Sequence, residues 1–150
     1  MALDTASKLT KRRDLAFGLE TTTGTAVAVG AAAGTIPVFN PEMPYSTEPV
    51  ERPGNGTLSR IRQGRGARSG TCTFESEVYG NETAALFDLL KLCGLTLSTA
   101  TLTPTSEPNQ TGTFGLYLSG KLKKLVGCMG TAVMRFRRGQ APRISWTFTG

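Results

Sequence analysis

Histidine is absent from this chain of 150 residues, and acidic residues are scarce, with 11 Asp and Glu against 17 Lys and Arg. Without an imidazole, the chain has no Ser-His-Asp or Cys-His catalytic set and no His-ligated metal site. We therefore expect no catalytic residues, no metal site, no cofactor and no enzymatic activity. A single domain of this length buries a hydrophobic core without help from disulfides or metals.

Long apolar runs and disulfide-type cysteine patterns are also missing. No run approaches the length of a membrane-spanning helix, and Glu20 interrupts the only apolar stretch near the N-terminus, so we expect no signal peptide and no membrane partner. The three cysteines, Cys72, Cys93 and Cys128, are too far apart for a metal knuckle. Their odd number favours a reducing compartment, and the apolar neighbours of Cys72 and Cys93 predict core positions.

Threonine and glycine are abundant instead, with 22 Thr and 18 Gly. Threonine favours strands and glycine marks turns, so the composition predicts a mainly β protein. Alternating apolar residues predict strands over residues 12–20 and 71–79, and a short strand over residues 35–39 that stops at Pro41. Residues 1–10 are predicted to form a polar N-terminal arm.

One helix is predicted over residues 81–94. Asn81 suits the N-cap, and Gly94 suits the position just after the last turn. The apolar stripe of this helix consists of Leu86, Leu89, Leu90 and Cys93.

The C-terminal part, residues 113–149, predicts an antiparallel meander. Its strands are expected over residues 113–119, 121–126, 130–138 and 143–149, after a weak strand over residues 99–103. Trp146 is predicted to anchor the core. Together the pattern predicts one domain, an antiparallel β-sandwich or β-barrel with one flanking helix and a long extended loop.

That loop is predicted over residues 40–70. Its prolines exclude a helix, its glycines favour irregular structure, and loops of this length in compact domains are usually functional. We interpret it as a docking arm because of its arginines, which are Arg52, Arg60, Arg62, Arg65 and Arg68. Its Arg-Gly composition also resembles segments that bind nucleic acids, although no aromatic side chain is interleaved between residues 60 and 70.

Charge is distributed unevenly along the chain. Residues 108–150 carry seven basic residues and no acidic one. Such a region is either a solvated set of strand faces or a surface that meets acidic groups of a neighbouring subunit or a nucleic-acid backbone. Glu75 and Glu77 share one strand face, where a solvated or inter-subunit ion pair is the expected role. Arg135, Arg137 and Arg143 are candidates for the same interface.

Several segments resemble bacteriophage tail tube (major tail) proteins of the siphophage type. They are FGLETTTGTAVA at residues 17–28, VERPGNG at 50–56, CTFESEVYG at 72–80, LLKLCG at 89–94, and the closing LYLSGKLKKLVGCMGTAVMRFRRGQAPRISWTFTG at 116–150. The resemblance covers most of the chain. It implies a small β-sandwich or barrel with one flanking helix.

The resemblance also implies an assembly and its partners. Members of the family form hexameric rings that stack into a β-lined tube, through which double-stranded DNA passes without sequence-specific binding. The N-terminal arm and the long loop would reach neighbouring subunits and rings. Other tail proteins, such as the tape measure and the terminator, would be further partners. The expected location is the virion tail, after assembly in the host cytoplasm.

Arginines that line a tube would hold passing DNA, because each phosphate contact adds affinity. We therefore expect Arg135, Arg137 and Arg143 to lie away from the lumen, paired with acids such as Glu75, Glu77 or Glu82. The alternatives left open are a distal tail, terminator or adaptor ring of the same fold and, from another class, a basic nucleic-acid-binding β-barrel module.

Overall fold

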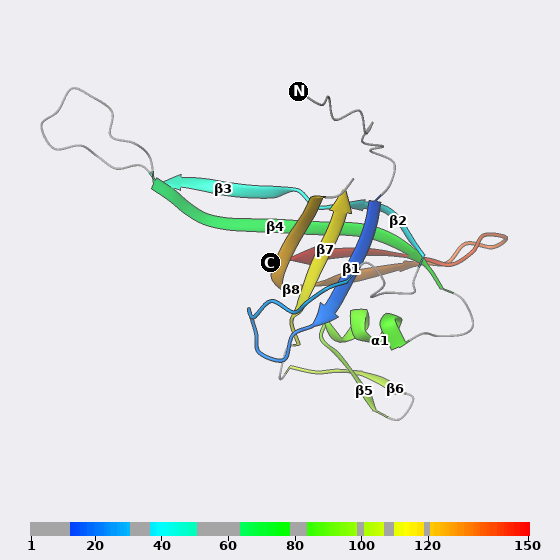
Figure 1. The fold of residues 1–150 in the computed structure, drawn as a ribbon. Helices are drawn as coiled ribbons and strands as arrows, with labels where there is room; N and C mark the ends of the chain where they lie inside the picture. The colour runs from blue at the N-terminus through cyan, green and yellow to red at the C-terminus, as the bar shows by residue number, and fades with distance from the viewer. Residues whose placement is uncertain are drawn as a thin grey trace, which may run out of the picture.

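The computed structural model describes residues 13–30, 37–50, 64–78, 84–98, 101–106, 110–118 and 121–150. Within these ranges the protein is mainly β with one short helix (Figure 1). The elements are β1 (Arg13–Leu19), β2 (Val38–Glu42), β3 (Tyr45–Val50), β4 (Gly64–Glu77), α1 (Ala84–Lys91), β5 (Leu95–Ser98), β6 (Thr101–Pro104), β7 (Gly112–Leu118), β8 (Lys121–Arg135) and β9 (Arg143–Thr149). The predicted arm at residues 1–10 lies outside the described residues.

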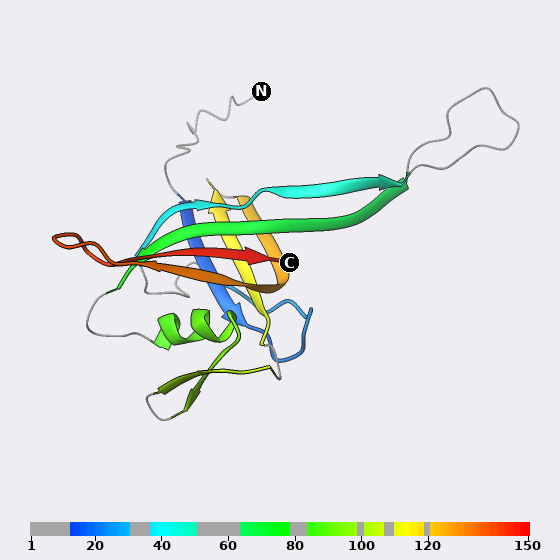
Figure 2. The same ribbon diagram turned by 180° about the vertical axis from the view of Figure 1, so that it is seen from behind.

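Seven of these strands form one antiparallel sheet in the order β1-β7-β8-β9-β4-β2, with β3 paired to the remaining half of β4. The sheet curls into a half-barrel, and α1 lies beside it with the small β5–β6 hairpin (Figure 2). Its two edges approach each other, since Arg13 Nη1 donates to the Pro41 carbonyl at 3.4 Å. The predicted antiparallel β fold with one flanking helix is confirmed.

β8 is one bent strand, not the two separate strands predicted over residues 121–126 and 130–138. Its first half pairs with β7 up to Cys128, and its second half pairs with β9 from Met129 onward. Gly127 has a φ of +69°, which a glycine adopts without strain, and it forms a bulge between the two halves. The bulge bends the strand without ending it, so the prediction of a break here was wrong.

Residues 40–70 contain strands where an irregular loop was predicted. β2 runs through Pro41 and does not stop before it, and its register against β4 shifts between Phe39 and Glu42, where Asn40 has a φ of 49°. Proline fits because β2 is an edge strand at this irregularity. The segment that the structure does not describe, residues 51–63, includes Arg52, Arg60 and Arg62.

The first half of β4 and β3 form a two-stranded projection, which we call the arm (β3 with residues 64–69 of β4). β9 pairs with β4 only from Thr71 onward, so the arm extends beyond the barrel (Figures 1 and 2). Glycine in the arm permits close strand approach, because a Cβ at Gly66 would collide with the Glu48 carbonyl oxygen. From composition alone, these glycines favour an irregular loop. In the structure they lie in paired strands, where the missing side chain lets the backbones approach each other.

The core lies on the concave side of the sheet. Its aromatic cluster consists of Phe17, Phe74, Phe114, Trp146 and Phe148, with ring centroids 4.6 to 6.2 Å apart. Trp146 is 1% exposed, and its Nε1 donates to Ser76 Oγ at 2.8 Å. The prediction that Trp146 anchors the core is confirmed.

α1 covers this core with the predicted stripe. Leu86, Leu89 and Leu90 are buried, and Cys93 packs against the core just after the helix. The helix ends at Lys91, three residues before the predicted end, and Gly94 has a φ of +80° in the turn that follows. The start predicted at residues 81–83 lies outside the described residues. β6 corresponds to the weak strand predicted over residues 99–103, while β5 was not predicted.

Candidate subunit interface

An ion-pair cluster lies on the outer face of the sheet, where β4 ends and β9 begins. Arg143 stands opposite Glu77 in the strand register. Its Nη2 lies 3.4 Å from Glu77 Oε1, and its Nη1 lies 3.6 Å from Glu75 Oε2. The Arg143 guanidinium also lies 5.3 Å from the centroid of the Phe39 ring. The predicted pairing of Arg143 with Glu75 and Glu77 is confirmed within one chain.

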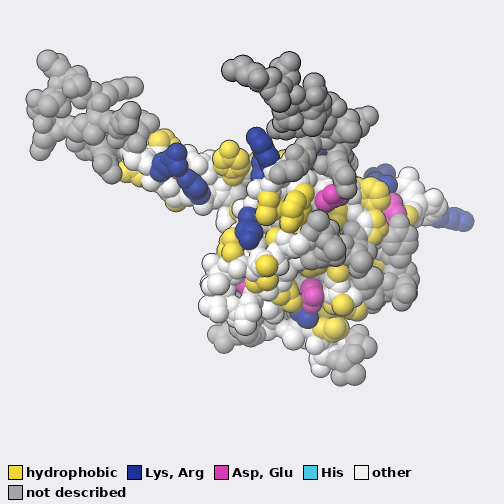
Figure 3. Space-filling model, in the orientation of Figure 1, with side chains coloured by type: hydrophobic (Ala, Val, Ile, Leu, Met, Phe, Trp, Pro, Cys, Tyr) yellow, Lys and Arg dark blue, Asp and Glu magenta, His cyan; other side chains and the backbone are white. Residues whose placement is uncertain are grey.

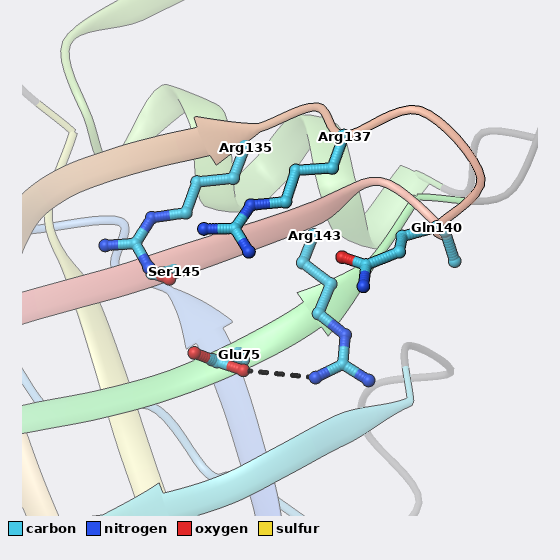
Figure 4. Close-up of a pocket in the computed structure, with 7 residues that line it drawn as sticks. Glu75, Arg135, Arg137, Gln140, Arg143 and Ser145 are labelled. Carbon is cyan, nitrogen blue, oxygen red and sulfur yellow. Dashed lines mark ion pairs between the residues drawn. The ribbon is translucent and has the colours of Figure 1, made fainter.

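Arg135 and Arg137 share this surface without a described acidic partner. Arg135 stands directly opposite Arg143 across the β8–β9 pair, and like charges in that position are unfavourable. Figure 4 shows the side chains of Arg135 and Arg137 extending side by side across β9. We call the surrounding space the arginine hollow. It measures about 470 Å³ and is lined by Glu75, Arg135, Arg137, Gln140, Ala141, Arg143 and Ser145.

The arm carries the other described candidates. Arg65 and Arg68 line a hollow of about 520 Å³ together with Tyr45 and Thr47. Tyr45 is 73% exposed, and Lys123 Nζ lies 5.5 Å from the centroid of its ring. The described members of the predicted interface therefore fall into two groups at opposite ends of the sheet, and Lys and Arg side chains are visible at both ends in Figure 3.

Exposed apolar side chains lie on the arm and along the second half of β8. On the arm they are Tyr45 and Val50. Along and just after the second half of β8 they are Met129, Val133, Met134 and Phe136. Of these, Val133 shares the face of Arg135, two residues further along the strand. Within the described ranges, Leu122 is the only other large apolar side chain of this kind. Clustered exposed apolar residues beside charged ones are typical of protein–protein contacts.

The comparison with protein families identifies one match. Residues 10–150 match the family of phage tail tube proteins. The chain belongs to the phage tail tube protein family. This confirms the resemblance carried by the sequence motifs and assigns a structural role in the phage tail tube. No curated protein matches the chain.

Membership of the tail tube family implies self-assembly, contacts with other tail proteins and a location in the virion tail. Among the described residues, no group of three or more His, Cys, Asp or Glu side chains is placed to hold a metal ion. The helix that the structure describes is too short to cross a membrane.

Sequence reasoning missed a buried carboxylate at the centre of this tail tube subunit. Glu20 follows β1 and is 4% exposed. Its Oε1 accepts hydrogen bonds from Thr113 Oγ1 at 2.7 Å and from the Gly127 amide at 2.8 Å. Its Oε2 accepts hydrogen bonds from Thr111 Oγ1 and the Gly24 amide, both at 2.8 Å. Four donors from three separate segments thus meet on one side chain.

The hydrogen bonds keep Glu20 ionised. Burial alone would raise the pKa of Glu20, but the bonds from Gly127, Thr113, Thr111 and Gly24 together lower it below the usual value. A sequence signal for this role exists, because residues 21–41 carry no charge at all and Glu20 stands alone at their start. The carboxylate joins the turn at Gly24 to β7 and to the bend of β8.

The three cysteines are core residues of the subunit. Cys72 and Cys128 are buried, and burial raises the pKa of each thiol to about 12. Burial also raises the pKa of Cys93 to about 11. Such thiols remain protonated at neutral pH and are poor nucleophiles. The core positions predicted for Cys72 and Cys93 are confirmed.

Proposed function

We propose that this tail tube protein is a non-enzymatic subunit that forms stacked sixfold rings, which make the DNA conduit of a phage tail. The family match over residues 10–150 carries this proposal. The strand order supports it, since β1 lies at one end of the sheet and no described strand pairs with its outer edge, which offers backbone groups to another chain. The exposed apolar residues on the arm and along the second half of β8 supply further contact area.

The first prediction concerns the assembled state. At high concentration the purified chain should form tubes of stacked rings with sixfold symmetry, visible by negative-stain electron microscopy and as large species in light scattering. Single closed rings that do not stack would favour a distal tail, terminator or adaptor protein. A strictly monomeric chain under all conditions would contradict the proposal.

The arm is proposed to dock on a neighbouring ring. An isolated two-stranded hairpin is marginally stable in water, so its extension beyond the barrel is best explained by a contact in the assembly. The exposed Arg65 and Arg68 lie on the arm, and Arg60 and Arg62 precede β4 in the chain. The proposed role of these arginines is to bind acidic or carbonyl groups of the next subunit.

The second prediction tests this role. Replacing Arg60, Arg62, Arg65 and Arg68 together with Ser should block stacking, because the charged contacts are lost while no core residue changes. Electron microscopy should show rings or monomers in place of tubes, and circular dichroism should show an unchanged β spectrum. The matched control is the pair Lys121→Ser and Arg138→Ser, which removes exposed basic side chains outside the arm. Normal tubes from the fourfold variant would show that the arm does not dock through these arginines.

A further inference from the structure

We propose that the arginine hollow is a binding site for a carboxylate of a second copy of this chain, supplied by Glu48 on the arm. This inference rests on the proposed assembly and names one of its contacts. It follows from three observations on the described residues: the unmatched charges, the position of the two surfaces and the apolar residues around them.

The charges at the hollow are incomplete. Arg143 is neutralised by Glu75 and Glu77, whereas Arg135 and Arg137 have no described acidic partner. Arg135 stands opposite Arg143, and the three arginines face only two described carboxylates, Glu75 and Glu77, so one positive charge is left over among the described residues. Gln140 adds an exposed amide to the lining. The guanidinium groups of Arg135 and Arg137 and the amide of Gln140 line one hollow (Figure 4). They can bind a carboxylate, which accepts several N–H donors at once.

Glu48 is the matching anion. It is exposed on β3, and no described side chain forms an ion pair with it. The arm register shifts between Thr47 and Pro49, so Glu48 lies against Gly66, which has no side chain to pair with it. Arg65 and Arg68 line the other hollow of the arm, and Glu48 is not part of that lining. Within the part of the chain that the structure describes, the carboxylate of Glu48 is therefore left without a partner.

The two surfaces lie at opposite ends of the same sheet. Figures 1 and 2 show the arm leaving one end of the barrel and the β8–β9 turn leaving the other. When each of two complementary surfaces binds a different neighbour, the contact is head to tail and repeats into rings or stacks.

Apolar residues accompany both charged groups. Val50 lies two residues after Glu48 on β3, and Val133 lies two residues before Arg135 on the same face of β8. A contact that joins these surfaces would bury apolar area around a charged pair, the usual composition of a protein interface. A passing nucleic acid offers phosphates but no apolar surface of this kind, so the lining favours a protein partner.

The third prediction is a charge exchange between copies. Glu48→Arg and Arg137→Glu should each raise the concentration needed for assembly by at least about tenfold, because each places like charges in contact. An equimolar mixture of the two variants should assemble within about threefold of the unmodified chain. In the mixture, alternating copies pair Arg at position 48 with Glu at position 137 and Glu48 with Arg137. Restoration by mixing can arise only from a contact between copies.

Arg138→Glu is the matched control, since Arg138 is an exposed turn arginine that does not line the arginine hollow. It should assemble as the unmodified chain does. Normal assembly of both single variants, or no restoration in the mixture, would overturn the proposed contact while leaving tube formation by the unmodified chain intact. Loss of salt-dependent DNA binding in Arg137→Glu, with normal assembly, would instead assign the hollow to nucleic acid. Failure of the unmodified chain to assemble would overturn the proposed function and this contact with it.

Discussion

Replacing Glu20 with Ala is expected to lower the free energy of unfolding of the subunit by about 4 kcal/mol. The substitution leaves the amides of Gly24 and Gly127 and the hydroxyls of Thr111 and Thr113 without their acceptor. Urea unfolding of the unassembled subunit, followed by tryptophan fluorescence, measures the change. Hydrogen exchange should also show lost protection of the Gly24 and Gly127 amides.

Glu20→Gln separates charge from shape. The amide keeps one acceptor oxygen but directs an NH₂ group toward two donors, so we expect a loss of about 2–3 kcal/mol. Asp88→Asn is the control, because Asp88 forms only a partly exposed pair with Lys91 and should cost less than about 0.5 kcal/mol. A Glu20→Gln variant as stable as the unmodified subunit would show that the carboxylate charge is not needed.

The same carboxylate predicts a pH dependence. The folded-state pKa of Glu20 lies below its usual value, so its contribution to stability is complete above the unfolded-state pKa of about 4.5. That contribution is lost as the pH falls through the lower, folded-state pKa. The stability difference between the unmodified subunit and Glu20→Gln should therefore shrink on acidification below pH of about 4. A difference that is independent of pH would contradict this assignment.

Replacing Trp146 with Ala is also expected to lower the free energy of unfolding by about 4 kcal/mol. The indole packs against both Phe74 and Phe148, with ring centroids 6.1 and 6.0 Å away, and is almost fully buried. The substitution leaves a cavity beneath the sheet and removes the donor to Ser76 Oγ. Urea unfolding followed by circular dichroism measures the loss, since the only tryptophan is removed.

Two variants test the reason for this effect. Trp146→Phe keeps a ring in the stack and loses the hydrogen bond to Ser76, so a smaller loss of about 2 kcal/mol is expected. Tyr45→Ala removes an aromatic side chain that is 73% exposed and should change the stability by less than about 0.5 kcal/mol. Equal losses from Trp146→Ala and Tyr45→Ala would mean that burial does not decide the outcome.

The sequence predicted the elements whose pattern is local. β1 and β9 follow from strict alternation, and α1 follows from the spacing of Leu86, Leu89 and Leu90. β3 and the first half of β4 were missed because their prolines and glycines weigh against any regular structure. They form strands through pairing with each other, a contact between distant residues that no local pattern encodes. The continuity of β8 was missed for a similar reason: Gly127 suits a turn between two strands as well as a bulge within one strand.

The same limit applies to the functional residues: local patterns predicted some of their contacts, and contacts between distant residues were missed. The predicted ion pairs of Arg143 with Glu75 and Glu77 are present: the register places Arg143 opposite Glu77, and the distances confirm both pairs. The hydrogen bonds of Glu20 were not predictable, because Thr111, Thr113 and Gly127 lie about a hundred residues further along the chain. Their meeting point depends on the order of β1, β7 and β8 in the folded sheet.

The bend of β8 at Gly127 sets the angle between the two halves of the sheet. Its amide is fixed by Glu20, which is itself held by β7 and the turn at Gly24. The curvature of each subunit is thus determined at one rigid corner. Identical subunits can close a circle of uniform diameter only when every copy has the same curvature. A single buried carboxylate would then help to fix the width of the bore that such a circle encloses.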